Sequence, residues 1–166
     1  SMTFELKPGL VLNDTYRLLE IIGRGGMGEV WKAQHERLPK VVAVKVLLDA
    51  DITNDTSFAR FRREAEIATR LGHPNIVEVL DFNTLPGGIP YMVLELLEGE
   101  SLRDRLKRGP LERDEVIRIL RQVGAALTEA HAQGVVHRDL KPENIFMALE
   151  PGEDGPVERA KVLDFG

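Results

Sequence analysis

The sequence predicts an α+β fold with a β-rich portion first and a helical portion second. Two observations support this order. Before Gly99 the apolar residues alternate in several short runs, which is typical of strands, and a single stretch has helical spacing. After Gly99 the apolar residues recur every three or four positions over two stretches, which indicates helices. We therefore expect two subdomains with a connector near residues 95–100.

The first portion is expected to form a sheet with one helix. Apolar residues alternate on both sides of a glycine-rich centre in 16–34, which predicts two strands joined by a flexible loop. In 57–72, apolar or small residues recur at helical spacing, which predicts a helix that ends at Gly72. Three further short runs, two of them separated by a Pro-Gly-Gly turn, predict strands at 40–48, 75–82 and 90–97.

The second portion is expected to be mainly helical. A short helix at 101–108 can take Ser101 as its N-cap. A long helix at 111–134 has one apolar face, formed by Val116, Leu120, Val123, Leu127 and Ala130. After it, the sequence predicts a proline-containing segment without regular helix, a mobile acidic loop at 150–159, and a strand, "AKVL", directly before Asp164.

Composition favours an ordinary globular protein and excludes several functions. The chain of 166 residues has a net charge of −5 and no long basic run, so nucleic-acid binding is not expected. It has no cysteine, which excludes a disulfide framework and fits a cytoplasmic protein. No apolar stretch approaches the length of a membrane span. Residues 1–14 are interpreted as an N-terminal extension in which Ser1 and Met2 are an expression scar.

The run "GRGGMGEV" places Gly23, Gly25 and Gly28 in the pattern G-x-G-x-x-G. Because glycine has no Cβ, backbone N–H groups in such a run can approach phosphate oxygens closely. On its own the run predicts no more than a flexible hairpin turn. A dinucleotide-binding turn is excluded by context, since it needs a helix directly after the glycines and this run leads into another strand.

Two charged residues are expected at interior positions. Lys45 lies in the predicted strand 40–48 between apolar neighbours, and a lysine on an interior face needs a counter-charge or an anionic ligand. Successive residues of a helix are rotated by about 100°. In the helix 57–72, Glu64 therefore falls inside the stripe of apolar or small residues, whereas Glu66 falls on the opposite face. We therefore expect Glu64 to be the partner of Lys45, with a pairing of Glu64 to a nearby arginine as the alternative.

The run "HRDLKPEN" is the most specific in the chain. It contains a candidate base, Asp139, a cation, Lys141, and an amide that can bind a metal, Asn144. Asp164 follows a predicted strand and supplies a second oxygen ligand. Oxygen ligands close to lysines are typical of sites that handle a nucleotide with Mg²⁺, because the metal prefers oxygen and the phosphate charge must be neutralised.

These motifs, in this order, resemble the eukaryotic-type (Hanks-type) protein kinase family. The resemblance extends from about Tyr16 to Gly166. It implies a bilobal protein-kinase-like fold with an N-lobe at 15–94, a hinge at 95–100 and part of a C-lobe at 101–166. The run "LKPEN" is similar to the serine/threonine branch, and "GRGGMGEVWKA" and "HPNIV" are similar to bacterial members.

The resemblance also implies a role for each matched residue. The loop 23–28 would cover the ATP phosphates, and Lys45, positioned by Glu64, would hold the α- and β-phosphates. Asp139 would accept or orient the proton of a protein Ser/Thr hydroxyl, and Lys141 would stabilise the γ-phosphate. The remaining roles are two Mg²⁺ ligands, Asn144 and Asp164; an adenine pocket of Ile22, Val30, Ala43 and Phe146; a gatekeeper, Leu94; and two hinge residues, Glu95 and Leu97, whose backbone would bond the base. His137 would pack structurally, and Phe165 would pack against the helix of Glu64.

The sequence departs from the family in two ways. The 20 positions from Asn144 to Asp164 exceed the family's usual hairpin, which we interpret as a tolerated surface insertion, with a docking loop as the alternative. The run ends just after Asp-Phe-Gly, so we expect a fragment without activation segment or substrate platform, little activity toward peptides, and a frayed end at Asp164 and Phe165. Self-association through the apolar face of the helix 111–134 is expected to follow.

Two other functions remain open at this point. A nucleotide-binding, pseudokinase-like scaffold would use the same fold without phosphotransfer, although the intact Lys45, Glu64, Asp139, Asn144 and Asp164 favour an active parent enzyme. A small-molecule phosphotransferase is less well supported, because the lysine and proline of "HRDLKPEN" are typical of protein kinases. The parent could also be anchored in a membrane through regions outside this sequence.

Overall fold

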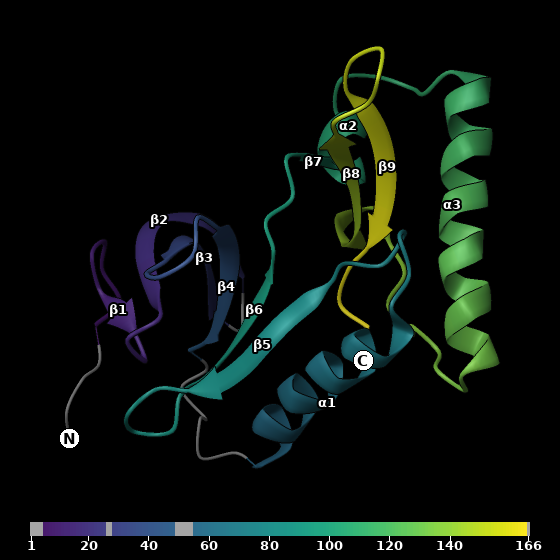
Figure 1. Cartoon of the computed structure of the whole chain (residues 1–166). Coiled ribbons are helices and arrows are strands. Elements are labelled where there is room, and N and C mark those ends of the chain that lie inside the picture. Colours follow the sequence, from purple (N-terminus) through teal and green to yellow (C-terminus); the bar gives the residue numbers. More distant parts are fainter. Residues whose placement is uncertain (1–4, 26–27, 49–54, 166) are drawn as a thin grey trace. The chain divides into compact units, whose positions relative to one another are not determined.

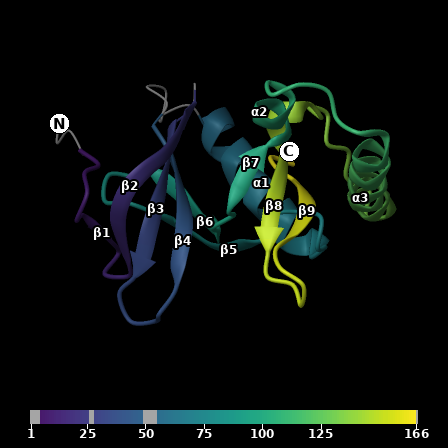
Figure 2. The ribbon, with the colours of Figure 1, turned by 90° about the horizontal axis from the view of Figure 1, so that it is seen from above.

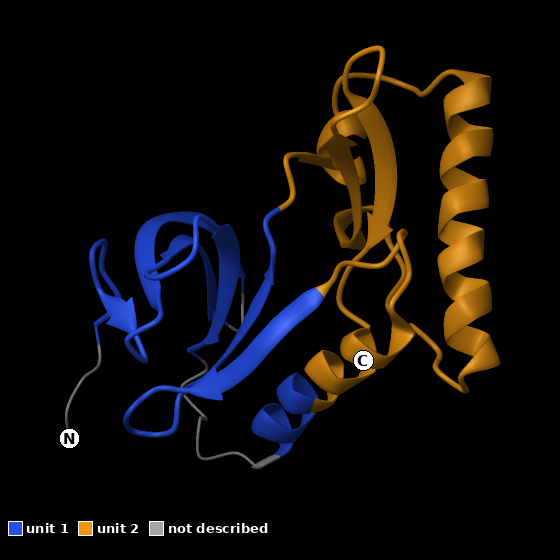
Figure 3. Ribbon diagram, in the orientation of Figure 1, with its two compact units in different colours: residues 1–62, 79–96 blue, residues 63–78, 97–166 orange. Residues whose placement is uncertain are grey.

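The computed structural model describes residues 5–25, 28–48 and 55–165 (Figure 1). The chain divides into two compact units, each built from two separate stretches (Figure 3). Unit 1 comprises residues 1–62 and 79–96, and unit 2 comprises residues 63–78 and 97–166.

Unit 1 is built on an antiparallel sheet of six strands, in the order β1-β2-β3-β4-β6-β5 (Figures 1 and 2). The sheet confirms the predicted strand pair around the glycines and the strand that carries Lys45. β1 was not predicted. It lies within residues 1–14, which were interpreted as an N-terminal extension, and it pairs with β2. The strands are β1 (Val11–Leu12), β2 (Tyr16–Gly25), β3 (Gly28–His35), β4 (Val41–Leu47), β5 (Val79–Thr84) and β6 (Pro90–Glu95).

One face of this sheet forms the core of unit 1. Val42, Val44 and Val46 alternate along β4 onto this face and are buried with Trp31 of β3 and Tyr91 of β6. The period of two in a strand sends the intervening residues, Ala43 and Lys45, to the other face, as predicted.

The predicted helix forms α1 (Asp55–Leu71), whose first part belongs to unit 1 and whose last part belongs to unit 2 (Figure 3). Phe61, Ala65, Ala68 and Leu71 are buried, as their spacing predicts. Ile67 is buried as well, although it lies outside the predicted stripe, because it packs in the core of unit 2. The buried surface of the helix is therefore wider than its sequence pattern indicates.

Unit 2 combines a sheet in the order β7-β8-β9 with helix α3, which packs against β9 (Figures 1 and 2). Ser101 caps the short helix as predicted, since its Oγ accepts a hydrogen bond of 3.0 Å from the Asp104 N–H. The elements are β7 (Gly99–Ser101), α2 (Leu102–Leu106), α3 (Arg113–Ala132), the 3₁₀ turn η1 (Pro142–Asn144), β8 (Ile145–Glu150) and β9 (Val157–Val162).

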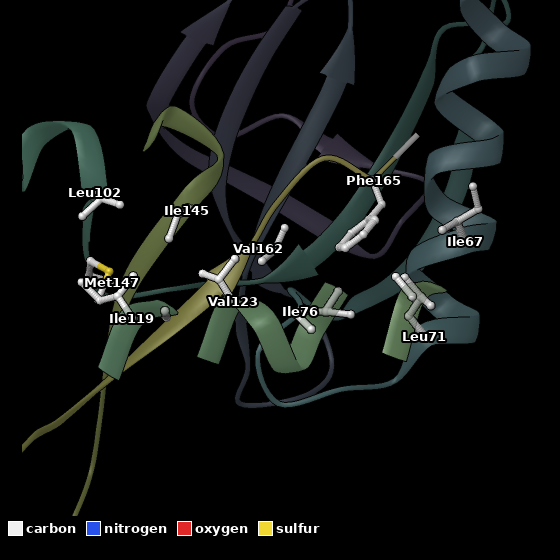
Figure 4. Packing of buried hydrophobic residues seen from close by; sticks show 13 residues of the cluster. Ile67, Leu71, Ile76, Leu102, Ile119, Val123, Ile145, Met147, Val162 and Phe165 are labelled. Carbon is white, nitrogen blue, oxygen red and sulfur yellow. The ribbon is translucent and has the colours of Figure 1, made fainter. Parts of the chain in front are cut away.

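The core of unit 2 collects side chains from α1, α3 and both long strands of the small sheet (Figure 4). Phe165 is 1% exposed in this cluster, together with Ile67 and Leu71 of α1. Its predicted packing against the helix of Glu64 is confirmed. The expectation of a frayed end is wrong for Phe165, because the apolar cluster holds its ring.

Two predicted boundaries were wrong, and one predicted face is only partly exposed. The strand 75–82 is displaced to β5, because Ile76 pairs in a parallel bridge with Val162 of unit 2. The loop 150–159 is shorter, since Glu150 and 157–159 belong to a regular hairpin in which Arg159 Nε lies 2.8 Å from Glu150 Oε2. On α3, Val116 and Leu120 of the predicted apolar face are exposed, as self-association would need, whereas Val123 and Ala130 are buried together with Ile119 and Ala126.

Candidate nucleotide site

The face of the unit 1 sheet opposite its core gathers five of the predicted nucleotide-binding residues. In the strand register Gly23 is opposite Val30, Val30 is opposite Lys45, and Ala43 is opposite Leu94. Residues directly opposite each other point to the same face, and so do residues two apart in one strand. The register therefore brings Gly23, Val30, Ala43, Lys45 and Leu94, which come from four strands, onto one continuous surface.

Lys45 is held at this surface by an aromatic ring as well as by its strand. Its Nζ lies 5.9 Å from the centroid of the Phe61 ring, within the range of a cation–π contact. Phe61 is buried on α1 and packs against Phe82 of β5, with ring centroids 5.7 Å apart. Lys45 is half-buried, and the ring of Phe61 favours its ammonium group at this position.

The glycines of the loop have different surroundings. A Cβ at Gly28 would lie 1.9 Å from the carbonyl oxygen of Val46, so the close approach of β3 and β4 requires glycine there. A Cβ at Gly23 would make ordinary contact with Val30, and a Cβ at Gly25 would meet no atom of the described chain within 4 Å. Packing among the described residues therefore does not explain glycine at Gly25. Gly26 and Met27, in the centre of the predicted loop, lie outside the described residues, as do Ser1, Met2 and Gly166.

Four further predicted pocket residues are divided between the units, two in each. In unit 1, Ile22 is exposed on β2 and Glu95 is half-buried at the end of β6. In unit 2, Leu97 is half-buried just after the unit boundary and Phe146 is half-buried on β8, opposite Lys161. Because these four residues belong to different units, their common role in one adenine pocket stays a prediction.

In unit 2 the segment "HRDLKPEN" folds back on itself, so that its polar side chains meet. Lys141 Nζ lies 3.3 Å from Asp139 Oδ2. Asn144 Nδ2 donates to the backbone oxygen of Asp139 at 2.8 Å and reaches its Oδ2 at 3.3 Å. Pro142 begins the turn η1, which returns the chain toward Asp139. A carboxylate, an ammonium and an amide are thereby held together at the start of β8.

His137 is buried beneath this segment, and both of its ring nitrogens are occupied. Its Nδ1 accepts a hydrogen bond of 3.1 Å from the Asp139 N–H, and its Nε2 lies 2.6 Å from the Leu163 carbonyl oxygen. The neutral ring with hydrogen on Nε2 satisfies both bonds. The ring also packs against Phe165, with centroids 4.7 Å apart. This environment supports the predicted structural role of His137.

Asp164 is brought to the same place by the β8–β9 pairing. Ile145 is opposite Val162, and beyond this pair the Leu163 N–H donates to the Asn144 carbonyl oxygen at 2.8 Å. Asp164 is the next residue, in a left-handed backbone conformation with φ 57°. Because the Asn144 Nδ2 group donates to Asp139, the amide oxygen Oδ1 is the atom of that side chain that could bind a metal ion. An amide oxygen and a carboxylate are suitable ligands for Mg²⁺.

The described part of the chain offers no alternative cluster of metal-binding side chains. Within the described ranges, no group of three or more His, Asp or Glu side chains lies close enough together to hold a metal ion. A Mg²⁺ site would therefore depend on Asn144 and Asp164, completed by water and phosphate oxygens, which is usual for this ion.

On α1, Glu64 is half-buried and Glu66 is exposed, in agreement with the helical geometry. Glu64 belongs to unit 2, whereas Lys45 belongs to unit 1, so their pairing stays a prediction. Two further residues with a bearing on the site were not predicted from the sequence. Phe61 was recognised only as part of an apolar stripe, and Asn75 was quoted only within the motif "HPNIV".

Tyr16, in the core of unit 1, has the clearest change in acidity. Burial and a hydrogen bond of 2.8 Å to Asp81 Oδ2 raise the pKa of Tyr16 well above the ordinary tyrosine value. Burial also raises the pKa of Tyr91, whose ring packs edge-on against Tyr16. Both tyrosines lie in the core cluster of unit 1, so these shifts concern stability rather than the site.

Comparison with known proteins places these motifs in context. Residues 16–166 match the family described as the protein kinase domain. The chain is 46% identical over 152 residues to the serine/threonine-protein kinase pkn3 of Myxococcus xanthus, covering 91% of this chain and 27% of that protein. It is 42% identical over 164 residues to the serine/threonine-protein kinase PknA of Mycobacterium tuberculosis, covering 95% of this chain and 36% of that protein.

The solved structures that are similar include the PknI kinase domain of Mycobacterium tuberculosis. The TM-score is 0.79 at 32% identity, and the match covers 97% of this chain and 61% of that one. The chain thus spans about a third or less of the curated relatives and about three fifths of a solved domain of the same fold. No described helix is long and apolar enough to cross a membrane.

Proposed function

The chain belongs to the protein kinase domain family, of the bacterial Hanks type, and on this basis we propose that it binds ATP with Mg²⁺. We further propose that it forms the nucleotide-handling part of a serine/threonine protein kinase. The observation that carries the proposal is the cluster in unit 2, in which Asp139, Lys141 and Asn144 contact one another and Asn144 bonds the residue before Asp164.

In the proposed site, the sheet face of unit 1 receives the nucleotide. Lys45 binds the α- and β-phosphates, and Glu64 orients it. Glycine at Gly25 allows the backbone to approach the phosphates, which fits the open space around it. The adenine lies between apolar side chains, with hydrogen bonds from the connector between the units. The adenine-binding residues of the proposal are Ile22, Val30, Ala43, Leu94, Glu95, Leu97 and Phe146.

The proposed chemistry uses unit 2. Asp139 orients the substrate hydroxyl and takes up its proton as the oxygen attacks the γ-phosphorus, while the bond from that phosphorus to the bridging oxygen of the β-phosphate breaks and ADP leaves. Lys141, 3.3 Å from that carboxylate, compensates the negative charge on the transferred group. Asn144 and Asp164 hold Mg²⁺, which when bound neutralises phosphate charge. Phosphotransfer to protein Ser/Thr hydroxyls is proposed for the whole protein, and because it consumes ATP we place this domain in the cytoplasm.

Nucleotide titrations test the proposal directly. The dissociation constant of ATP is measured by calorimetry with and without Mg²⁺, on the chain and on Asp164→Ala. We expect Mg²⁺ to tighten binding to the chain and to have little effect on the variant, because the variant lacks one ligand. Glu153→Ala, in the turn between β8 and β9, is the matched control and should keep the effect. Absence of nucleotide binding by the chain would overturn the proposal.

We also propose that copies of this chain associate through α3. Val116, Ile117 and Leu120 form an apolar stripe on the exposed side of this helix, and the side chain with the largest exposure is Leu120 at 65%. Exposed apolar stripes of this kind favour association, because contact removes them from water.

A further inference from the structure

Strand β9 leads directly to Asp164, and it lies at the edge of the unit 2 sheet, with β8 on one side and α3 packed against it (Figure 1). An edge strand leaves its outward backbone groups without strand partners. Buried groups of this kind must find other hydrogen bonds, or the unit loses stability. The outward groups of β9 therefore indicate which residues hold the strand in place.

Ala160 has both outward backbone groups bonded by side-chain amides. Its N–H donates to Gln122 Oε1 of α3 at 2.6 Å. Its carbonyl oxygen accepts from Asn75 Nδ2 at 3.0 Å. Ala160 is fully buried and Asn75 is 6% exposed, so water does not replace these bonds. Two amides from distant parts of the chain thus take the place of a neighbouring strand.

The same arrangement continues two residues later. The Val162 N–H donates to the Asn75 carbonyl oxygen at 2.8 Å, and the Val162 carbonyl oxygen accepts from the Val77 N–H at 3.1 Å. On the inner side, Leu163 bonds the backbone of Asn144 and its carbonyl oxygen contacts His137. The strand is consequently held on both edges immediately before Asp164.

From this geometry we propose that Asn75 and Gln122 are positioning residues for Asp164. The inference rests on the proposed function, in which Asp164 is a Mg²⁺ ligand. A left-handed backbone at a residue other than glycine persists only when its surroundings fix it, and Asp164 has this conformation. Residues that orient a metal ligand affect metal affinity strongly, although they do not touch the metal. Asn75 and Gln122 act in this way through the backbone of β9.

The test uses two substitutions that remove one amide each while conserving size. Asn75→Leu removes the donor to Ala160, and Gln122→Met removes the acceptor. The dissociation constant of ATP is measured with and without Mg²⁺, and the ratio of the two values gives the Mg²⁺ enhancement. We expect the enhancement to fall roughly 10-fold in both variants, while affinity without Mg²⁺ is unchanged. Gln122→Glu keeps an acceptor oxygen and should restore the enhancement.

A matched control lies on the same helix and the same strand. Arg118 Nη2 lies 2.7 Å from Glu158 Oε1, so Arg118→Met breaks a contact between α3 and β9 without affecting Ala160. It should keep the full enhancement. Thermal unfolding monitors the fold, and if Asn75→Leu does not fold, Gln122→Met and Gln122→Glu decide the question.

The outcomes separate the two proposals. If the chain binds ATP with a Mg²⁺ enhancement and Gln122→Met retains it, or loses affinity equally with and without Mg²⁺, the positioning role is wrong and the proposed function stands. If the unaltered chain has no enhancement, the role of Asp164 as a ligand fails, and the positioning role fails with it.

Discussion

Gly25 and Gly28 belong to the same motif, but a side chain at each position would meet different surroundings. At Gly28 a Cβ collides with the backbone of β4, whereas at Gly25 no described atom is near. We expect Gly28→Ala to lower the free energy of unfolding by about 1–3 kcal/mol, as overpacking does. Gly25→Ala should change it by less than about 0.5 kcal/mol, as substitutions away from packed features do, and should weaken ATP binding.

Urea denaturation and ATP titration of the two variants measure these effects. Each variant serves as the control for the other, because the substitution is the same and only the surroundings differ. Equal losses of stability would mean that strand packing does not distinguish the two glycines. Unchanged ATP affinity in Gly25→Ala would remove the support that this position gives to a phosphate-binding loop.

Tyr16 links the stability of unit 1 to alkaline pH. Its pKa is raised from the ordinary value of 10.0, chiefly by burial and then by Asp81. The unfolded chain therefore releases this proton at a lower pH than the folded chain. Tyr16 contributes its full stabilisation below pH 10, and the contribution is lost as the pH rises from there toward the folded pKa.

Tyr16→Phe should reduce this alkaline loss of stability. The free energy of unfolding of the chain and of the variant is measured from pH 8 to 11, and tyrosinate absorbance follows ionisation, since the chain has two tyrosines. Tyr91 stays in the variant and retains its own, separate contribution. Two parallel pH profiles would contradict the assignment.

Elements with one strong local pattern were predicted correctly from the sequence. The strands around the glycines, the strand of Lys45 and the helix of Glu64 depend on periodicity within a few residues, and the catalytic segment depends on motif order. These features need no information about the rest of the chain. The candidate site residues within each unit could therefore be named before the structure was known, and their roles stay predictions.

The elements that were wrong depend on partners far away in sequence. Ile76 has a strand-like neighbourhood, but it pairs with Val162, so β5 begins later. On α3, whose apolar face was expected to drive self-association, only the position of β9 decides that Val123 and Ala130 are buried together with Ile119. Arg159 and Glu150 are polar enough to suggest a loop, yet they stabilise a hairpin by pairing across it.

Contacts between distant residues also explain what was missed at the site. The ring of Phe61 on α1 contacts Lys45 of β4, and the amide of Asn75 donates to Ala160 of β9. No local sequence pattern shows that these segments lie close together. Both residues were visible in the sequence as members of a stripe or motif. Their roles required the fold.

At the scale of the whole molecule, the exposed stripe on α3 should control association. Leu120→Lys places a charge in the stripe of Val116, Ile117 and Leu120, so we expect the apparent mass at micromolar concentrations to fall toward that of a monomer. Leu38→Lys, at a position 56% exposed in unit 1, is the matched control and should leave the apparent mass unchanged. Light scattering over a concentration series measures both. A strictly monomeric unaltered chain would contradict the proposal.

The shared helix α1 also has a consequence for how the chain can fold during synthesis. Unit 1 is complete only when residue 96 has left the ribosome, and residues 63–78, which belong to unit 2, leave before it. At that stage Ile67, Leu71 and Ile76 have none of their later partners in α3, β8 and β9. A nascent or excised segment ending at residue 96 would therefore present these three side chains to water, and it would be a ready substrate for chaperones that bind apolar sequences.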